Sequence, residues 1–166
     1  LLGPATQFLP FNLGDAGGAG NPPYAKGHRT HYLWEQVWQR DSWLEIIERY
    51  LVTVRDEKKK IKTIIFPRYH QLDATRQLVQ SVLADGPGSK YLIQHSAGSG
   101  KTNSIAWTGH FLSYLHAAQN NKVFSSVLVV SDRNVLDAQL QDAIFDFQRI
   151  TGVVQTITGN DASKSQ

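Results

Sequence analysis

Cysteine is absent from the 166 residues. Without thiols, the chain has neither a disulfide framework nor a thiolate zinc site. No apolar run approaches the roughly 18 residues needed to cross a bilayer, and no N-terminal signal pattern is present. We therefore expect a soluble, cytoplasmic protein without a membrane partner.

Glutamate is absent after Glu57, so any catalytic carboxylate further along must be an aspartate. The balance of 17 basic against 14 acidic residues gives a net charge of only +3. This small excess is compatible with a polyanionic partner but does not indicate one. With 41% hydrophobic and 19% charged residues, the composition is that of a globular protein.

The first third of the chain is irregular and then helical. Residues 9–27 are rich in Gly, Pro and Asn and predict a surface loop. Residues 31–38 and 41–51 have helical apolar spacing, with Asp41 as the expected N-cap, and 55–60 form a charged break. We expect 1–30 to be the tail of an upstream domain and 31–60 a helical spacer. Three tryptophans at helical spacing predict core packing rather than stacking on bases: Trp34, Trp38 and Trp43.

Residues 61–166 read as a second part, of α/β class. Helices are predicted over 70–84, 101–118 and 133–150, and strands over 91–95, 125–131 and 152–158, with a turn at 85–90. Alternation of strands and helices at this spacing predicts a parallel sheet with covering helices.

The stretch "GSGKT" (98–102) lies between a predicted strand and a predicted helix, where a phosphate-binding loop belongs. Gly98 and Gly100 allow successive N–H groups to point at phosphate oxygens. Lys101 can reach the β- and γ-phosphates as the catalytic cation, and Thr102 can offer its hydroxyl to Mg²⁺. The expected cofactor-binding loop is Ala97, Gly98, Ser99, Gly100, Lys101 and Thr102.

His95 replaces the first Gly of the usual G-x-x-x-x-G-K-[ST] pattern. That position lies at the end of the strand and need not touch phosphate. The alternative is a Gly-rich turn that contains Lys-Thr by chance, but it leaves two glycines, the lysine, the hydroxyl and the flanking elements unexplained.

The stretch "FPRYHQLDA" (66–74) resembles the adenine-reading segment of superfamily-2 helicases. The amide of Gln71 can pair with a donor and an acceptor on adenine, a pattern that guanine does not match. We expect Gln71, with Arg68 nearby, to read the base. The alternative is a polar helix start after Pro67.

Residues 125–140 permit two interpretations. Asp132 follows an apolar run and could bind Mg²⁺, but Arg133 stands where a catalytic Glu would be expected. We favour a DNA contact through Ser131, Asp132 and Arg133, with Asp132 capping a helix. The nuclease-like "EKK" beginning at Glu57 lies in a charged run without a preceding strand Asp, and a solvated turn is favoured there.

Several stretches together resemble the restriction (R) subunit of type I restriction-modification enzymes: "FLPFNLGDAGGAGNP" (8–22), "FPRYHQLDA" and "QHSAGSGK" (94–101). The resemblance runs from about Gln7 to Val154. In that family a histidine also occupies the position of His95. The resemblance implies an ATP- and Mg²⁺-dependent, superfamily-2 helicase-like translocase that moves duplex DNA and cleaves it. It also implies methyltransferase and specificity subunits as partners.

The resemblance further implies that residues 61–166 are the N-terminal part of a first RecA-like motor domain, with an incomplete P-loop sheet. The nuclease carboxylates, the Asp-Glu-x-His element and the arginine finger of the family have no counterpart in this sequence. We therefore expect this fragment alone to bind nucleotide poorly and to turn over little ATP. The alternatives are another superfamily-2 DNA or RNA helicase and a non-catalytic P-loop scaffold; a small-molecule kinase is disfavoured by the adenine-type segment.

Overall fold

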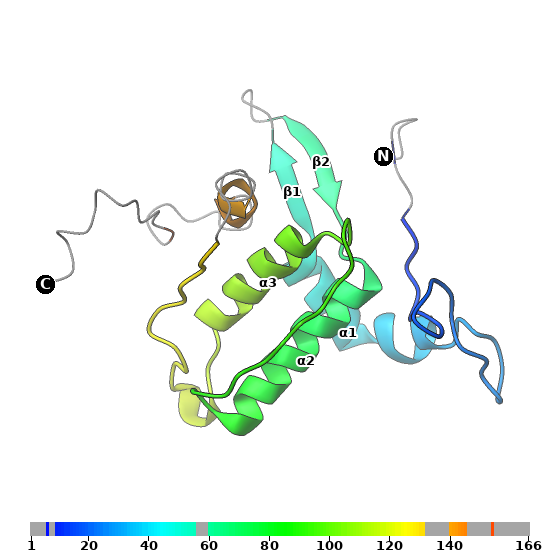
Figure 1. Ribbon diagram of the computed structural model, residues 1–166, viewed down its shortest axis with the longest axis horizontal. Helices are drawn as coiled ribbons and strands as arrows, with labels where there is room; N and C mark the ends of the chain where they lie inside the picture. Colours follow the sequence, from blue (N-terminus) through cyan, green and yellow to red (C-terminus); the bar gives the residue numbers. More distant parts are fainter. Residues whose placement is uncertain (1–5, 7–8, 56–59, 132–139, 146–153, 155–166) are drawn as a thin grey trace, which may run out of the picture. The chain divides into compact units, whose positions relative to one another are not determined.

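The computed structural model describes residues 6, 9–55, 60–131, 140–145 and 154. The chain divides into two compact units, Leu1–Arg76 and Gln77–Gln166, and the division falls within a helix. Figure 1 labels the main helices and strands in chain order. Among the described residues, no helix is long and apolar enough to span a membrane.

The helical character predicted for residues 31–51 is confirmed. A π-helical turn, η1 (Leu33–Val37), is followed by α1 (Arg40–Glu45) and a second π-helical turn, η2 (Ile46–Tyr50). The prediction that Asp41 is the N-cap is wrong, because Gln39 is the last residue with non-helical angles, with φ −59° and ψ 141°. Asp41 instead lies in the first turn, where a negative charge favours the helix dipole.

The prediction that the three tryptophans form core is also wrong. Trp34, Trp38 and Trp43 are 44%, 56% and 37% exposed, while Tyr32, Val37, Ile46 and Tyr50 are buried. For Trp34 and Trp38 the π-helical turn accounts for the difference, because the Trp38 amide donates to the Leu33 carbonyl five residues earlier. This wider turn changes which side chains share a face, so the spacing of an α-helix does not apply.

A β-hairpin follows the helices and was not expected from the sequence. β1 (Val52–Arg55) pairs antiparallel with β2 (Ile61–Ile65), with Val52 opposite Ile65 and an irregularity at Val54/Arg55 (Figure 1). The β-branched residues of both strands favour this pairing. β1 ends at Arg55, the first residue of the charged run 55–60, and β2 begins directly after the run. The domain boundary at residue 60 stays a prediction.

The two main helices were predicted correctly. α2 (Tyr69–Asp85) and α3 (Lys101–Ser113) match the periodic segments 70–84 and 101–118, although α3 ends earlier. A turn at 87–88 and an irregular loop over 96–100 also agree with the sequence. Trp107, Phe111 and Leu115 are buried at a spacing of four residues, which places one face of α3, and Leu115 two positions after its end, in the core of the second unit.

Residues 91–95 and 125–131 differ from the prediction, because neither segment forms a β-strand. Leu92 is 89% and Val130 is 82% exposed. An apolar run favours an extended chain, but a strand also needs a neighbour that supplies hydrogen-bond partners. The sheet of the described residues is the antiparallel β1–β2 pair, so the fold is mixed helix and strand.

Two other predicted elements lie mostly outside the described residues. Residues 140–145 are helical, in agreement with the helix expected over 133–150. The strand expected over 152–158 lies outside the described part, except for residue 154.

Candidate nucleotide-binding site

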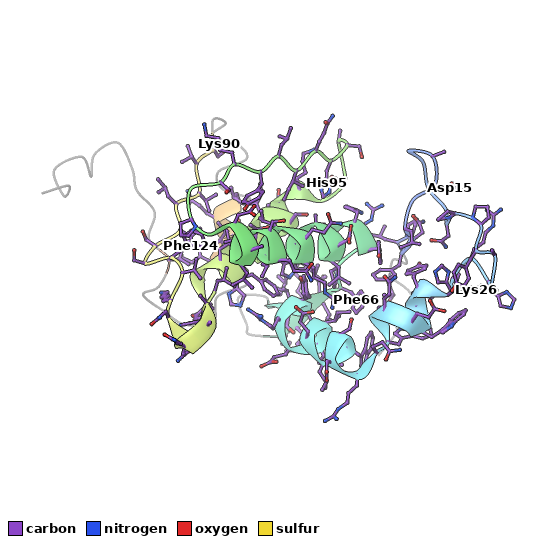
Figure 2. All side chains as sticks on the ribbon, turned by 90° about the horizontal axis from the view of Figure 1, so that it is seen from below. Asp15, Lys26, Phe66, Lys90, His95 and Phe124 are labelled. Carbon is purple, nitrogen blue, oxygen red and sulfur yellow. The ribbon has the colours of Figure 1, made fainter. Side chains whose placement is uncertain are left out.

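The loop over residues 96–100 leads directly into α3, and Figure 2 labels His95 at its start. Gly98 has φ +72° and Gly100 has φ +79°, both in the left-handed region. Such angles are strained for residues with a Cβ atom and ordinary for glycine. The two glycines therefore give the loop a path that most other residues would resist.

The N-terminus of α3 provides backbone donors. Gly100 is its N-cap, and no side chain caps the helix. The Asn103 and Ser104 amides donate to the Gly100 carbonyl at 3.1 and 3.3 Å. Helix geometry leaves the earlier amides, those of Lys101 and Thr102, without partners inside the helix. These donors and the helix dipole together favour an anion at this end.

Lys101 folds its side chain back over the loop. Its Nζ donates to the carbonyl oxygens of Ser96 at 2.8 Å and His95 at 3.2 Å. His95 therefore contributes its carbonyl group to this contact, which any residue could supply. This explains in physical terms why a residue other than glycine is compatible with the loop at this position.

The residues present fit a nucleoside triphosphate. The ammonium group of Lys101 is held by two neutral carbonyl groups, and an anionic phosphate oxygen is a stronger acceptor than a carbonyl. Thr102 lies in the first turn of α3 and would offer one hydroxyl oxygen to Mg²⁺, whose other ligands are commonly phosphate oxygens and water. Among the described residues, no cluster of three or more His, Cys, Asp or Glu could hold a metal by itself.

The left-handed angle at Gly98 leads to a prediction with a matched control. Gly98→Ala should lower the free energy of unfolding by roughly 1–2 kcal/mol, because alanine is strained at this φ although no atom lies within 4 Å of its Cβ. Gly109→Ala should raise it by up to about 1 kcal/mol, because Gly109 lies inside α3 and its Cβ would meet Val129 Cγ2 at an ordinary 3.9 Å.

Urea denaturation of the two variants of the 166-residue chain measures the change in the free energy of unfolding for each, and the two changes should have opposite signs. Equal effects of both substitutions would contradict the role assigned to the loop glycine.

Arg68 and Gln71 lie together at the start of α2. The Arg68 amide donates to Gln71 Oε1 at 2.8 Å, and Thr75 Oγ1 donates to the Gln71 carbonyl at 2.8 Å. Gln71 is 3% exposed. The amide contact is one half of a capping box, in which the third residue of a helix satisfies the N-cap amide. The helix start after Pro67, given above as the alternative for this segment, is therefore observed, while the cap supplied by the Gln71 side chain was not predicted.

Arg68 carries a further feature. Its Nε is buried and has no hydrogen-bond acceptor within the described part of the chain. A buried donor of this kind suits an acceptor on a ligand. The structure therefore assigns Gln71 a contact that caps α2, and it leaves the Nε–H group of Arg68 able to donate a hydrogen bond to a ligand.

The predicted residues are distributed over both units. Arg68 and Gln71 belong to the first, and residues 97–102 belong to the second. Ser131 is half-buried and lies outside any helix or strand, while Asp132 and Arg133 lie outside the described residues. The DNA contact and the alternative metal role of Asp132 stay predictions.

The site combines a glycine loop, a lysine folded over it and a helix start without a side-chain cap. This combination is typical of nucleotide-binding proteins. Comparison with protein families gives a match of residues 70–164 to the SWI2/SNF2 ATPase family. The match covers more than half of the chain, and the chain belongs to this family of ATP-hydrolysing, helicase-like enzymes. No curated protein and no solved structure matches the sequence.

Proposed function

We propose that this chain is the ATP-binding part of a DNA translocase of the type I restriction enzyme kind. The observation that carries the proposal is the loop, with two left-handed glycines and Lys101 Nζ bonded to the Ser96 and His95 carbonyl groups. The family match supports ATP hydrolysis by a helicase-like motor. The resemblance of the stretches around Asn12, Arg68 and His95 supports the restriction subunit in particular.

In this proposal the loop binds the phosphates. The backbone amides of Ala97, Gly98, Ser99 and Gly100 and the ammonium group of Lys101 hold the β- and γ-phosphates. Thr102 supplies its hydroxyl to Mg²⁺, which neutralises phosphate charge when bound. We infer that in the complete motor this loop belongs to a RecA-like domain with a parallel sheet, which the alternation of predicted strands and helices over residues 61–166 supports.

The other assigned residues read the base and the DNA. Gln71 and Arg68 contact adenine, and Ser131, Asp132 and Arg133 contact the DNA backbone. Duplex DNA is the track on which the motor moves. The methyltransferase and specificity subunits complete the enzyme, and the sequence-specific DNA site is read by the specificity subunit.

The test measures ATP hydrolysis by the complete protein that carries this chain. Duplex DNA should stimulate the rate in the presence of Mg²⁺, and single-stranded RNA should not. Stimulation by RNA alone would identify a different superfamily-2 helicase. ATP binding without turnover under any nucleic acid would identify a P-loop scaffold and overturn the motor.

A further inference from the structure

Four aromatic rings form a cluster around the start of α2 in the first unit; we call Phe11, Tyr32, Phe66 and Tyr69 the aromatic cluster. The ring centroid of Phe11 lies 5.9 Å from that of Phe66 and 5.7 Å from that of Tyr69. The Tyr32 and Tyr69 centroids are 5.2 Å apart, nearly edge to face. These distances and angles are in the favourable range for aromatic pairs.

Polar contacts fix the cluster in one arrangement. The Tyr32 hydroxyl donates to the Phe11 carbonyl at 2.6 Å, and the Tyr69 hydroxyl donates to Gln36 Oε1 at 3.4 Å. Burial raises the pKa of both tyrosines, so each hydroxyl keeps its proton and remains a donor. Residues from the loop before Asp15 and from the helical segment 32–36 therefore contact Tyr69.

A second contact holds α2 two turns further along. Arg76 Nε donates to Glu45 Oε2 at 2.9 Å, and its Nη2 donates to the same oxygen at 2.6 Å and to Ser42 Oγ at 2.9 Å. The pair is only partly exposed, 25% for Arg76 and 30% for Glu45. The first two turns of α2 are thus attached to the preceding helices at Tyr69 and at Arg76.

Gln71 lies between these two attachments. Its Oε1 faces the Arg68 amide, which can only donate, so oxygen must be the atom at that position. The orientation of the side-chain amide is therefore set by the turn that precedes it. Tyr69 directly follows Arg68 in the chain, so we expect a displacement of Tyr69 to disturb the Arg68 contact that orients the Gln71 amide.

We propose that Tyr69 and Tyr32 are positioning residues that set the orientation of the Gln71 amide and thereby the preference for adenine over guanine. This inference rests on the proposed function, in which Gln71 reads the base. It adds that the loop and helices preceding the motor segment determine the nucleotide specificity of the site, although they carry no nucleotide-binding residue themselves.

The experiment measures dissociation constants for ATP, GTP and inorganic triphosphate with the complete protein. The wild type should prefer ATP to GTP by about tenfold, the effect of two net hydrogen bonds. Tyr69→Ala should bring this ratio close to one while the affinity for triphosphate is kept. Tyr69→Phe should restore the ratio, because it keeps the ring. Tyr91→Ala, at a tyrosine 39% exposed in the other unit, should leave it unchanged.

Tyr32→Phe provides a milder test that does not depend on Tyr69→Ala folding. It removes the hydrogen bond to the Phe11 carbonyl and should lower the ATP-to-GTP preference about threefold. If Tyr69→Ala or Tyr32→Phe binds triphosphate normally and keeps the wild-type preference while Gln71→Ala loses it, the positioning role is overturned and the proposed function stands. A wild type that binds ATP and GTP equally would overturn base reading by Gln71, and the inference with it.

Discussion

Lys101→Ala is expected to lower the rate of ATP hydrolysis by the complete protein at least a hundredfold. The reason is that Lys101 is the cation at the loop, where the Ser96 and His95 carbonyl groups accept hydrogen bonds from its Nζ. Its ammonium group would stabilise the negative charge that develops on the γ-phosphate during hydrolysis. Loss of a single preorganised electrostatic contact of this kind commonly costs two to three orders of magnitude, about 10²–10³.

The control for this substitution is Lys90→Ala. Lys90 is an exposed lysine in the segment between α2 and the loop, labelled in Figure 2, and it has no assigned role at the nucleotide. Its replacement should leave the rate unchanged. Turnover by Lys101→Ala at the wild-type rate would exclude the loop as the hydrolytic phosphate site, and equal losses in both variants would indicate a general effect of positive charge.

Trp107→Ala is expected to have the largest effect on stability. Trp107 is completely buried on the core face of α3. Along the helix it follows Lys101 and precedes Phe111, which is also buried. Removing a buried aromatic side chain loses its transfer free energy and leaves a cavity, at a cost of about 3–5 kcal/mol. Because a domain is stabilised by only about 5–15 kcal/mol, this substitution should remove much of the stability of the second unit.

Trp38→Ala is the matched control, since Trp38 is 56% exposed. Its replacement should change the free energy of unfolding by no more than about 0.5 kcal/mol. Urea denaturation followed by far-UV circular dichroism gives both values. A larger loss for Trp38 than for Trp107 would contradict the assignment of core and surface.

The sequence predicted the parts of the fold that depend on local pattern. The periodic segment before Asp85 and the one that begins at Lys101 became α2 and α3, because one apolar face and a clear start specify a helix by themselves. The hairpin of β1 and β2 was missed, because the charged run between its strands suggested a break and short strands carry a weak signal. The segments around Leu92 and Val130 were predicted as strands but form none. Their apolar character does not by itself provide the neighbouring strand that a β-sheet requires.

The candidate site was predictable to a similar degree. The glycines of the loop and Lys101 follow from the motif, because the motif encodes backbone angles and a charge. The carbonyl contacts of Lys101 and the cap that Gln71 provides to Arg68 were not predicted, since they depend on how a side chain folds back on its own chain. The packing of Tyr32 against Tyr69 joins residues 37 positions apart, which no local pattern specifies.

The most direct test of the central claim is a titration of the isotope-labelled chain with Mg-ATP, followed through the backbone amide signals of residues 97–102. If this loop holds the phosphates, the signals of Gly98, Gly100 and Lys101 should shift and saturate together, and inorganic triphosphate should shift the same signals. Saturable ATP binding that leaves these amides unchanged, or no binding at all, would contradict it.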